Sequence, residues 1–115
     1  MARVLVVDDE PDIRGLIRLI LELEGHEVTE AHHGLAALEL IARSVPDVLV
    51  TDVMMPMLDG AGLIDRLRDD PATRATPILV VSASPHQVER ADVVMRKPFA
   101  PADLRRVVRE LADGH

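Results

Sequence analysis

Five polar side chains stand where short apolar runs of the sequence end: Asp8, Asp9, Asp52, Ser82 and Lys97. Three carboxylates brought together repel one another, so they predict a bound cation. Carboxylate oxygens with no cysteine partner suit a hard ion, and a site with few protein ligands favours Mg²⁺ over Ca²⁺. The ammonium of Lys97 and the hydroxyl of Ser82 are donors that match the oxygens of a phosphoryl group. This set of residues predicts a phosphoryl-transfer site.

Asp52 is the expected nucleophile of this site. It stands alone after the run Val48–Thr51, whereas Asp8 and Asp9 form a pair that is better suited to holding a metal. A carboxylate can take a phosphoryl group covalently as an acyl phosphate, and it needs no general base because it is already ionised at pH 7. Taken alone, Asp8, Asp9 and Glu10 are better explained as an acidic turn that favours the start of a helix. The presence of Asp52, Ser82 and Lys97 favours the functional interpretation.

The apolar runs before these residues are typical of strands that are buried on both faces. We expect strands over residues 3–7, 26–31, 48–51, 77–82 and 93–95. Helical spacing of apolar residues begins near Pro11, Gly34, Gly60 and Pro101, and residues 83–91 leave room for two turns of a further helix. Alternating strands and helices predict an α/β fold, with five helices around a doubly wound, five-stranded parallel sheet. Parallel strands bring all the polar strand ends to one edge, where such sheets bind ligands.

Each expected helix has an apolar stripe that we predict to face the sheet. In the first helix the stripe consists of Ile13, Leu16, Ile17, Ile20, Leu21 and Leu23, and in the second of Leu35, Leu38, Ile41 and Ala42. In the third it consists of Leu63, Ile64 and Leu67, and in the last of Leu104, Val107, Val108 and Leu111.

The composition excludes several classes of protein. A chain of 115 residues is expected to form one domain. A net charge of -7 and a single aromatic residue argue against binding to nucleic acid, because phosphates would be repelled and bases would find no stacking platform. Cysteine is absent, and no apolar run approaches the ~20 residues of a membrane span. We therefore expect a soluble, cytoplasmic protein.

The order and spacing of the motifs resemble the receiver domain of bacterial two-component response regulators. The residues that carry the resemblance are Asp8-Asp9, Asp52, Met55-Pro56, Asp59-Gly60, Ser82-Ala83 and Lys97-Pro98-Phe99. The resemblance covers essentially the whole chain. It implies a single receiver domain over residues 1–115, with a flavodoxin-like sheet in strand order 2-1-3-4-5. It also implies that no effector domain follows, so that the protein works alone or is an excised receiver.

The resemblance also implies a role for each site residue. Asp52 would accept a phosphoryl group from a histidine kinase or a histidine phosphotransfer protein. Asp9, Asp52 and the backbone carbonyl of Met54 would bind Mg²⁺, with Asp8 bound through water. Lys97 would hold the phosphoryl oxygens and precede a cis peptide bond, and Ser82 would move toward the phosphoryl group. The modified domain would bind a protein output partner. The sequence identifies neither this partner nor whether the domain forms a homodimer.

Two departures from the family pattern concern how the domain signals, and a third concerns the start of the last helix. Val94 stands three residues before Lys97, where the family usually has the aromatic ring that couples to the strand-four hydroxyl. Residues 83–96 are shorter than the family spacing by about two helical turns, so we expect a shortened fourth helix. Ala100 stands at the expected N-cap of the last helix without a side-chain acceptor, for which Asp103 partly compensates.

Two other functions remain as alternatives. A receiver-fold interaction module without phospho-switching is compatible with Val94 and the short fourth helix. A Mg²⁺-dependent aspartyl phosphatase is disfavoured because Met54 stands where that chemistry usually requires a second acid. Met54 and Ser84 offer no acid or amide to an attacking water, so we expect little enzymatic activity beyond self-phosphorylation from phosphodonors and slow self-dephosphorylation.

Other polar residues have simpler interpretations. We interpret His32, His33 and His86 as loop residues because no partner stands at ligand spacing. The arginines of the last helix are interpreted as its solvated face, and a basic patch for an acidic partner is the alternative. That patch would consist of Arg90, Arg96, Arg105, Arg106 and Arg109.

Overall fold

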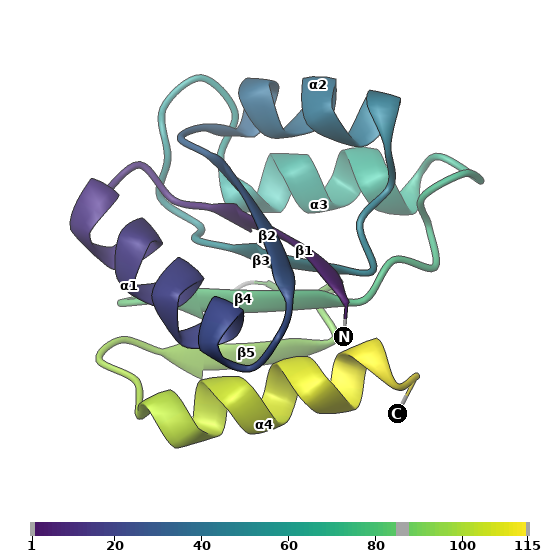
Figure 1. The fold of residues 1–115 in the computed structure, drawn as a ribbon. Helices are drawn as coiled ribbons and strands as arrows, with labels where there is room; N and C mark the ends of the chain where they lie inside the picture. The colour runs from purple at the N-terminus through teal and green to yellow at the C-terminus, as the bar shows by residue number, and fades with distance from the viewer. Residues whose placement is uncertain (1, 85–87, 115) are drawn as a thin grey trace.

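Five strands form a single parallel sheet (Figure 1). The computed structural model describes residues 2–84 and 88–114. The strands are β1 (Arg3–Val7), β2 (Glu27–Ala31), β3 (Val48–Thr51), β4 (Ile78–Ser82) and β5 (Val93–Arg96). They are arranged in the order β2-β1-β3-β4-β5, and every neighbouring pair is parallel. The expected fold class and strand order are confirmed.

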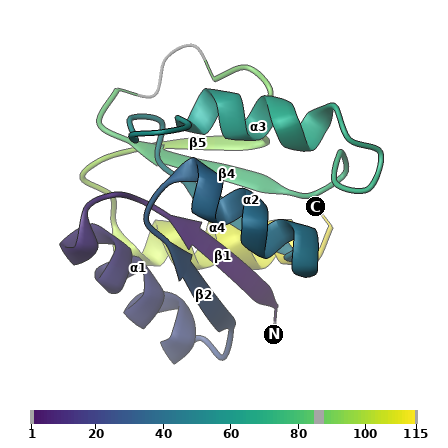
Figure 2. The same ribbon diagram turned by 90° about the horizontal axis from the view of Figure 1, so that it is seen from above.

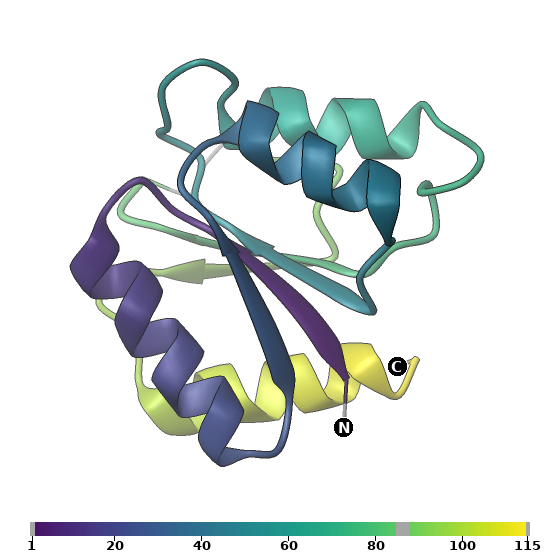
Figure 3. The same ribbon diagram turned by 45° about the horizontal axis from the view of Figure 1, so that its top comes forward.

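Helices cover both faces of this sheet. They are α1 (Pro11–Leu23), α2 (Gly34–Arg43), α3 (Gly60–Arg68) and α4 (Pro101–Ala112). Helices α2 and α3 lie above the sheet in Figure 1, and α1 and α4 lie below it; Figures 2 and 3 show the same layers from other sides. None of the helices in the described ranges combines the length and the apolarity that crossing a bilayer requires.

The central strands β1, β3 and β4 are buried on both faces, and their side chains alternate between two cores. Val4 and Val6 of β1 pack into the core between the sheet and helices α1 and α4. Leu5 and Val7 pack into the core between the sheet and helices α2 and α3. This double burial explains why the strands are nearly continuous in apolar residues. It also specifies the register of each strand strongly, because a slip by one residue would move each side chain to the opposite face of the sheet.

The predicted buried faces are confirmed for α3 and α4 but are wrong in part for the first two helices. In α1, Leu16 and Leu23 are 44% and 77% exposed. In α2 the buried face includes Ala37, whereas Leu35 is exposed. Apolar residues stand on more than one side of both helices, so spacing alone could not select the side that meets the sheet.

The connection between β4 and β5 corrects the expected helix count. The structure has four helices in its described residues instead of the expected five, and residues 83–84 and 88–92 form bends and turns. Val88 is buried in the core of α2 and α3, and Arg90 forms ion pairs with Asp65 at 3.0 Å and Asp69 at 3.1 Å. Within the described residues, the short connection is therefore held on α3 by a buried valine and surface ion pairs.

Arg68, near the end of α3, ties the same connection to the body of the fold. Its guanidinium donates to the carbonyls of Arg74, Thr76 and Arg90 and pairs with Asp92 at 2.8 Å. The Asp92 carboxylate also accepts a hydrogen bond from the Ile78 N–H at 2.7 Å. One side chain thus holds the start of β4 and the start of β5 together.

Candidate functional site

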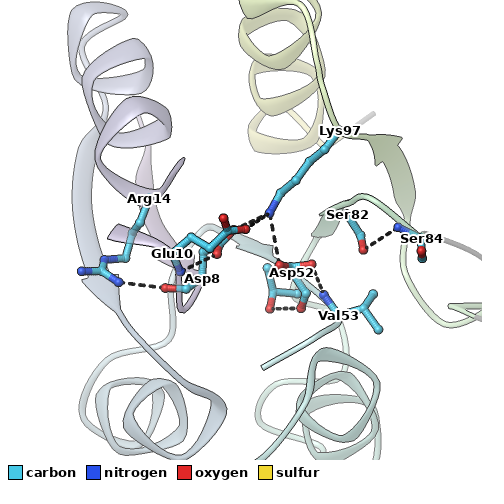
Figure 4. Close-up of polar contacts among 9 residues, drawn as sticks. Asp8, Glu10, Arg14, Asp52, Val53, Ser82, Ser84 and Lys97 are labelled. Carbon is cyan, nitrogen blue, oxygen red and sulfur yellow. Dashed lines mark hydrogen bonds and ion pairs between the residues drawn. The ribbon is translucent and has the colours of Figure 1, made fainter. Parts of the chain in front are cut away.

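The carboxyl ends of the strands bring four of the five predicted side chains to one edge (Figure 4). Asp8 follows β1, Asp52 follows β3, Ser82 ends β4 and Lys97 follows β5. Asp8, Asp52 and Ser82 are 2%, 6% and 1% exposed. Burying carboxylates carries a large free-energy penalty unless a positive charge compensates them, so the charge opposite Asp8 and Asp52 decides whether this edge is stable.

Lys97 supplies that charge. Its Nζ lies 2.9 Å from Asp8 Oδ2 and 3.1 Å from Asp52 Oδ2, and Glu10 Oε1 lies 3.5 Å away at the exposed rim. Lys97 is the only lysine in the sequence. Its backbone N–H donates to the carbonyl of Ser82 at 2.9 Å, and the Lys97-Pro98 bond is cis, as expected.

The pKa values follow from this arrangement. Burial raises the pKa of the Asp8 carboxyl, and hydrogen bonds from the Glu10 N–H and from Lys97 only partly offset it. Burial would lower the pKa of Lys97, but its hydrogen bonds to Asp8 and Asp52 outweigh burial and raise that pKa. Lys97 is therefore charged throughout the physiological pH range. Ionisation of Asp8, in contrast, has a free-energy cost because its carboxylate is buried.

The Asp52 carboxylate is fixed from two sides. Its Oδ1 accepts a hydrogen bond from the Val53 N–H at 2.7 Å, and its Oδ2 faces Lys97. The Asp52 N–H donates to the carbonyl of Val7 at 3.0 Å, which continues the pairing of β3 with β1 past the end of the strand. The side chain predicted from the sequence as the phosphoacceptor is thus buried, and each of its carboxylate oxygens accepts a hydrogen bond.

The turn after Asp52 requires glycine at position 60. A Cβ atom on Gly60 would lie 2.1 Å from the Asp52 carbonyl oxygen and 2.8 Å from the Val53 Cα. The Gly60 N–H donates to the Val53 carbonyl at 2.8 Å, and Asp59 caps α3 by accepting from the Gly62 N–H at 2.8 Å. The start of α3 is therefore pressed against the backbone of Asp52.

The acidic cluster differs in composition from the predicted one. Oxygen atoms of Asp8, Glu10 and Asp52 all lie within 4.8 Å of one another. Asp9 is exposed and stands outside this group, and Met54 is 71% exposed in the β3–α3 loop. From the sequence, Glu10 is expected in an acidic turn and is not assigned to the site. Its signal was its position directly after the aspartate pair.

Ser82 lies at the edge of the cluster with its hydroxyl turned toward the next loop (Figure 4). Its Oγ accepts a hydrogen bond from the Ser84 N–H at 3.2 Å. Val94, which stands in place of the aromatic ring, is 40% exposed on β5. The described hydrogen bond of the Ser82 hydroxyl thus leads into the β4–β5 connection.

The arginines of the suggested basic patch are largely paired with acids. Arg90 pairs with Asp65 and Asp69. Arg106 pairs with Asp103 and Glu110. Arg109 pairs with Glu24. These pairs are solvent-exposed and contribute little to stability. They neutralise the surface that a strongly acidic partner would need.

The histidines described by the structure have local roles. His33 is the N-cap of α2, and its Nδ1 accepts a hydrogen bond from the Ala36 N–H at 3.0 Å. His86 lies outside the described residues. His32 and His33 lie between β2 and α2, which agrees with their interpretation as loop residues.

Comparison with known proteins identifies one family. Residues 4–109 match the response regulator receiver domain. The response regulator MprA of Mycobacterium ulcerans is 43% identical over 119 aligned positions, which cover 95% of this chain and 49% of that protein. The chain therefore spans about half the length of this relative.

Solved structures agree with this match. The Francisella response regulator 1452 receiver domain superposes with a TM-score of 0.89 at 34% identity, and 98% of each chain is covered. The chemotaxis response regulator CheY4 of Vibrio cholerae superposes with a TM-score of 0.88 at 31% identity, which covers 96% of this chain and 98% of that one.

Proposed function

Because this chain belongs to the response regulator receiver domain family, we propose that Asp52 accepts a phosphoryl group from a phosphohistidine and that the modified domain changes its binding to a protein partner. The observation that carries the proposal is a buried Asp52 carboxylate, held in place by the only lysine of the chain and flanked by further acids. A structural ion pair alone would not account for three acids around one lysine.

In the proposed transfer, a carboxylate oxygen of Asp52 attacks the phosphorus of the donor. A P–O bond forms as the P–N bond of the phosphohistidine breaks, and the imidazole nitrogen leaves with the electron pair and takes a proton from water. Lys97 then turns from the two carboxylates toward the phosphoryl oxygens. Ser82 supplies a hydroxyl donor from the neighbouring strand end.

The acidic cluster fits Mg²⁺. Carboxylate oxygens of Asp8, Glu10 and Asp52 within 4.8 Å of one another are the hard ligands that this ion prefers. We propose Asp8, Asp9, Asp52 and the backbone carbonyl of Met54 as its ligands, with Glu10 at the rim. Bound Mg²⁺ would offset the negative charge that accumulates on the phosphoryl group during transfer.

A candidate docking face for the phosphodonor runs along α1, from the middle of the helix to its last residue. Leu16, Leu19 and Leu23 are 44%, 55% and 77% exposed and follow one another along α1. Exposed leucines at helical spacing are typical of surfaces that pack against a partner helix. We propose that a helix of the histidine kinase or phosphotransfer protein packs on this stripe and that the encounter takes place in the cytoplasm.

The modified state is proposed to be long-lived. The residues beside the expected path of a hydrolytic water, Met54 and Ser84, provide neither a carboxylate nor an amide to orient it. Self-dephosphorylation, like self-phosphorylation from small phosphodonors, is then the limit of the chain's own catalysis.

A constitutive interaction module remains the second candidate. It is favoured by Val94, which offers no aromatic ring to report on Asp52, and by the short β4–β5 connection. The two candidates differ in whether the affinity for a partner changes with phosphorylation.

Incubation with acetyl phosphate and Mg²⁺ tests the leading proposal. Intact-mass spectrometry is expected to detect one added phosphoryl group that hydroxylamine removes. Asp52→Asn should abolish the addition, whereas Asp103→Asn, an exposed acid of α4, should leave it unchanged. Labelling that persists in Asp52→Asn, or no labelling of the wild type, would refute the proposal.

A further inference from the structure

Arg14, in the first turns of α1, connects the acidic edge to the end of β2. Its Nη1 donates a hydrogen bond to the backbone carbonyl of Asp8 at 2.8 Å (Figure 4), and its Nε donates to Glu30 Oε1 at 2.7 Å. The Arg14 side chain is only 20% exposed. The proposed phosphoryl transfer uses neither contact.

The Asp8 carbonyl is the point at which the turn after β1 is held. The Asp8 N–H donates to the Ala31 carbonyl at 3.2 Å, and the Asp8 carboxylate is bound by Lys97 and the Glu10 N–H. The carbonyl belongs to the peptide group that leads to Asp9 and Glu10. A guanidinium that fixes this peptide also fixes the direction in which the next two carboxylates leave the turn.

Arg18 provides a comparison within the same helix. It pairs with the other oxygen of Glu30, Oε2, at 2.7 Å, and with Glu22 at 3.0 Å. Its side chain is 42% exposed, and its described hydrogen bonds go to Glu30 and Glu22, not to the turn after β1. The two arginines therefore share Glu30 and the same charge but differ in their contact with Asp8.

We propose that Arg14 is a positioning residue for the cation site, an inference that rests on the Mg²⁺ site of the proposed function. Glu30 orients the guanidinium, and the guanidinium holds the Asp8 peptide so that the carboxylates of Asp8 and Glu10 lie beside Asp52. Groups that orient metal ligands in this way typically contribute about 10- to 100-fold to metal affinity.

Charge and positioning predict opposite effects when Arg14 is neutralised. Arg14 carries a positive charge beside a site for a cation, so its electrostatic effect alone weakens Mg²⁺ binding, and its removal should tighten binding. If the hydrogen bond to the Asp8 carbonyl positions the site, removal should instead weaken binding. The sign of the change separates the two explanations.

The test is a Mg²⁺ titration of the full chain, followed by amide NMR spectra, for the wild type, Arg14→Gln and Arg18→Gln. We expect Arg14→Gln to raise the Kd for Mg²⁺ by about tenfold. Arg18→Gln also removes one positive charge near Glu30 and should change the Kd by less than about twofold, in either direction. The maximal rate of phosphorylation at saturating Mg²⁺ should be the same in all three proteins.

Arg14→Lys covers the case in which Arg14→Gln does not fold. A lysine keeps the charge but has one nitrogen, which cannot replace both donors of the guanidinium in their fixed geometry. It should therefore also weaken Mg²⁺ binding. A Kd in either Arg14 variant that equals or falls below that of the wild type would overturn the inference. Failure of the wild type itself to bind Mg²⁺ would instead overturn the cation site of the proposed function, and with it the inference.

Discussion

Replacement of Lys97 by methionine should strongly destabilise the protein in the absence of metal. The ammonium lies 2.9 Å from Asp8 and 3.1 Å from Asp52, and its side chain is only 13% exposed. At an effective dielectric constant of about 20, each of these attractions is worth about 5 to 6 kcal/mol before desolvation is subtracted. Desolvation of the three groups removes most of this gain from the wild type.

The variant, however, retains the desolvation of both carboxylates and loses the attraction. Removal of one partner from a buried ion pair typically costs about 3–5 kcal/mol, and we expect a loss at the lower end, about 3 kcal/mol at pH 7. Protonation limits the loss: without Lys97, the already raised pKa of Asp8 rises further, so the folded variant binds a proton more readily than its unfolded chain does. The difference from the wild type should therefore shrink as the pH falls.

Urea unfolding followed by circular dichroism, with EDTA present, measures this loss. Arg106→Met is the matched control, because Arg106 also contacts two carboxylates but is 51% exposed, and it should lose less than about 1 kcal/mol. Added Mg²⁺ should stabilise Lys97→Met more than the wild type, since the ion replaces the missing positive charge. Equal losses in the two variants would refute the view that Lys97 compensates buried acids.

Three further predictions concern the backbone, the acidic edge and the docking face. Gly60→Ala should slow phosphorylation of Asp52 by acetyl phosphate and lower the unfolding midpoint, because its Cβ would meet the Asp52 carbonyl oxygen at 2.1 Å. Gly15→Ala, whose Cβ would meet no atom within 4 Å, should instead raise the stability by about 1 kcal/mol, and equal effects in the same assays would contradict the reasoning. The pKa of Asp8 is raised in the folded protein above its ordinary value of 3.8. At pH values between 3.8 and the folded-state pKa, Asp8 is therefore protonated in the folded protein but ionised in the unfolded chain. The metal-free wild type should therefore lose stability relative to Asp8→Asn as the pH rises from 3.8 through the folded-state pKa, and a constant difference between their unfolding free energies would exclude this effect. Leu19→Asn should slow phosphotransfer from the kinase but not from acetyl phosphate, with stability changed by less than about 0.5 kcal/mol; an unchanged transfer rate from the kinase would argue against docking on α1.

Much of the fold could be predicted from local patterns. Strands that are apolar on both faces, such as Val48–Thr51, are typical of a parallel sheet that is covered on both sides. The periodicity of α4 identified its buried face correctly because most of its other positions are charged. The wrong assignments of a buried face fall on α1 and α2, where Leu16, Leu23 and Leu35 extend the apolar pattern onto the solvent side. An apolar residue that serves a partner cannot be told from one that serves the core by spacing alone.

The meeting of Asp8, Asp52, Ser82 and Lys97 at one edge could be predicted from the sequence, because each follows or ends a strand and parallel strands end on the same edge. Only the tertiary structure decided which acid of the turn joins the cluster, since the direction of a side chain just past a strand depends on how the turn is held. Here Glu10 faces Asp52 while Asp9 faces solvent. The Arg14 contact with the Asp8 carbonyl crosses from a helix to a strand end, and no local periodicity encodes such a contact.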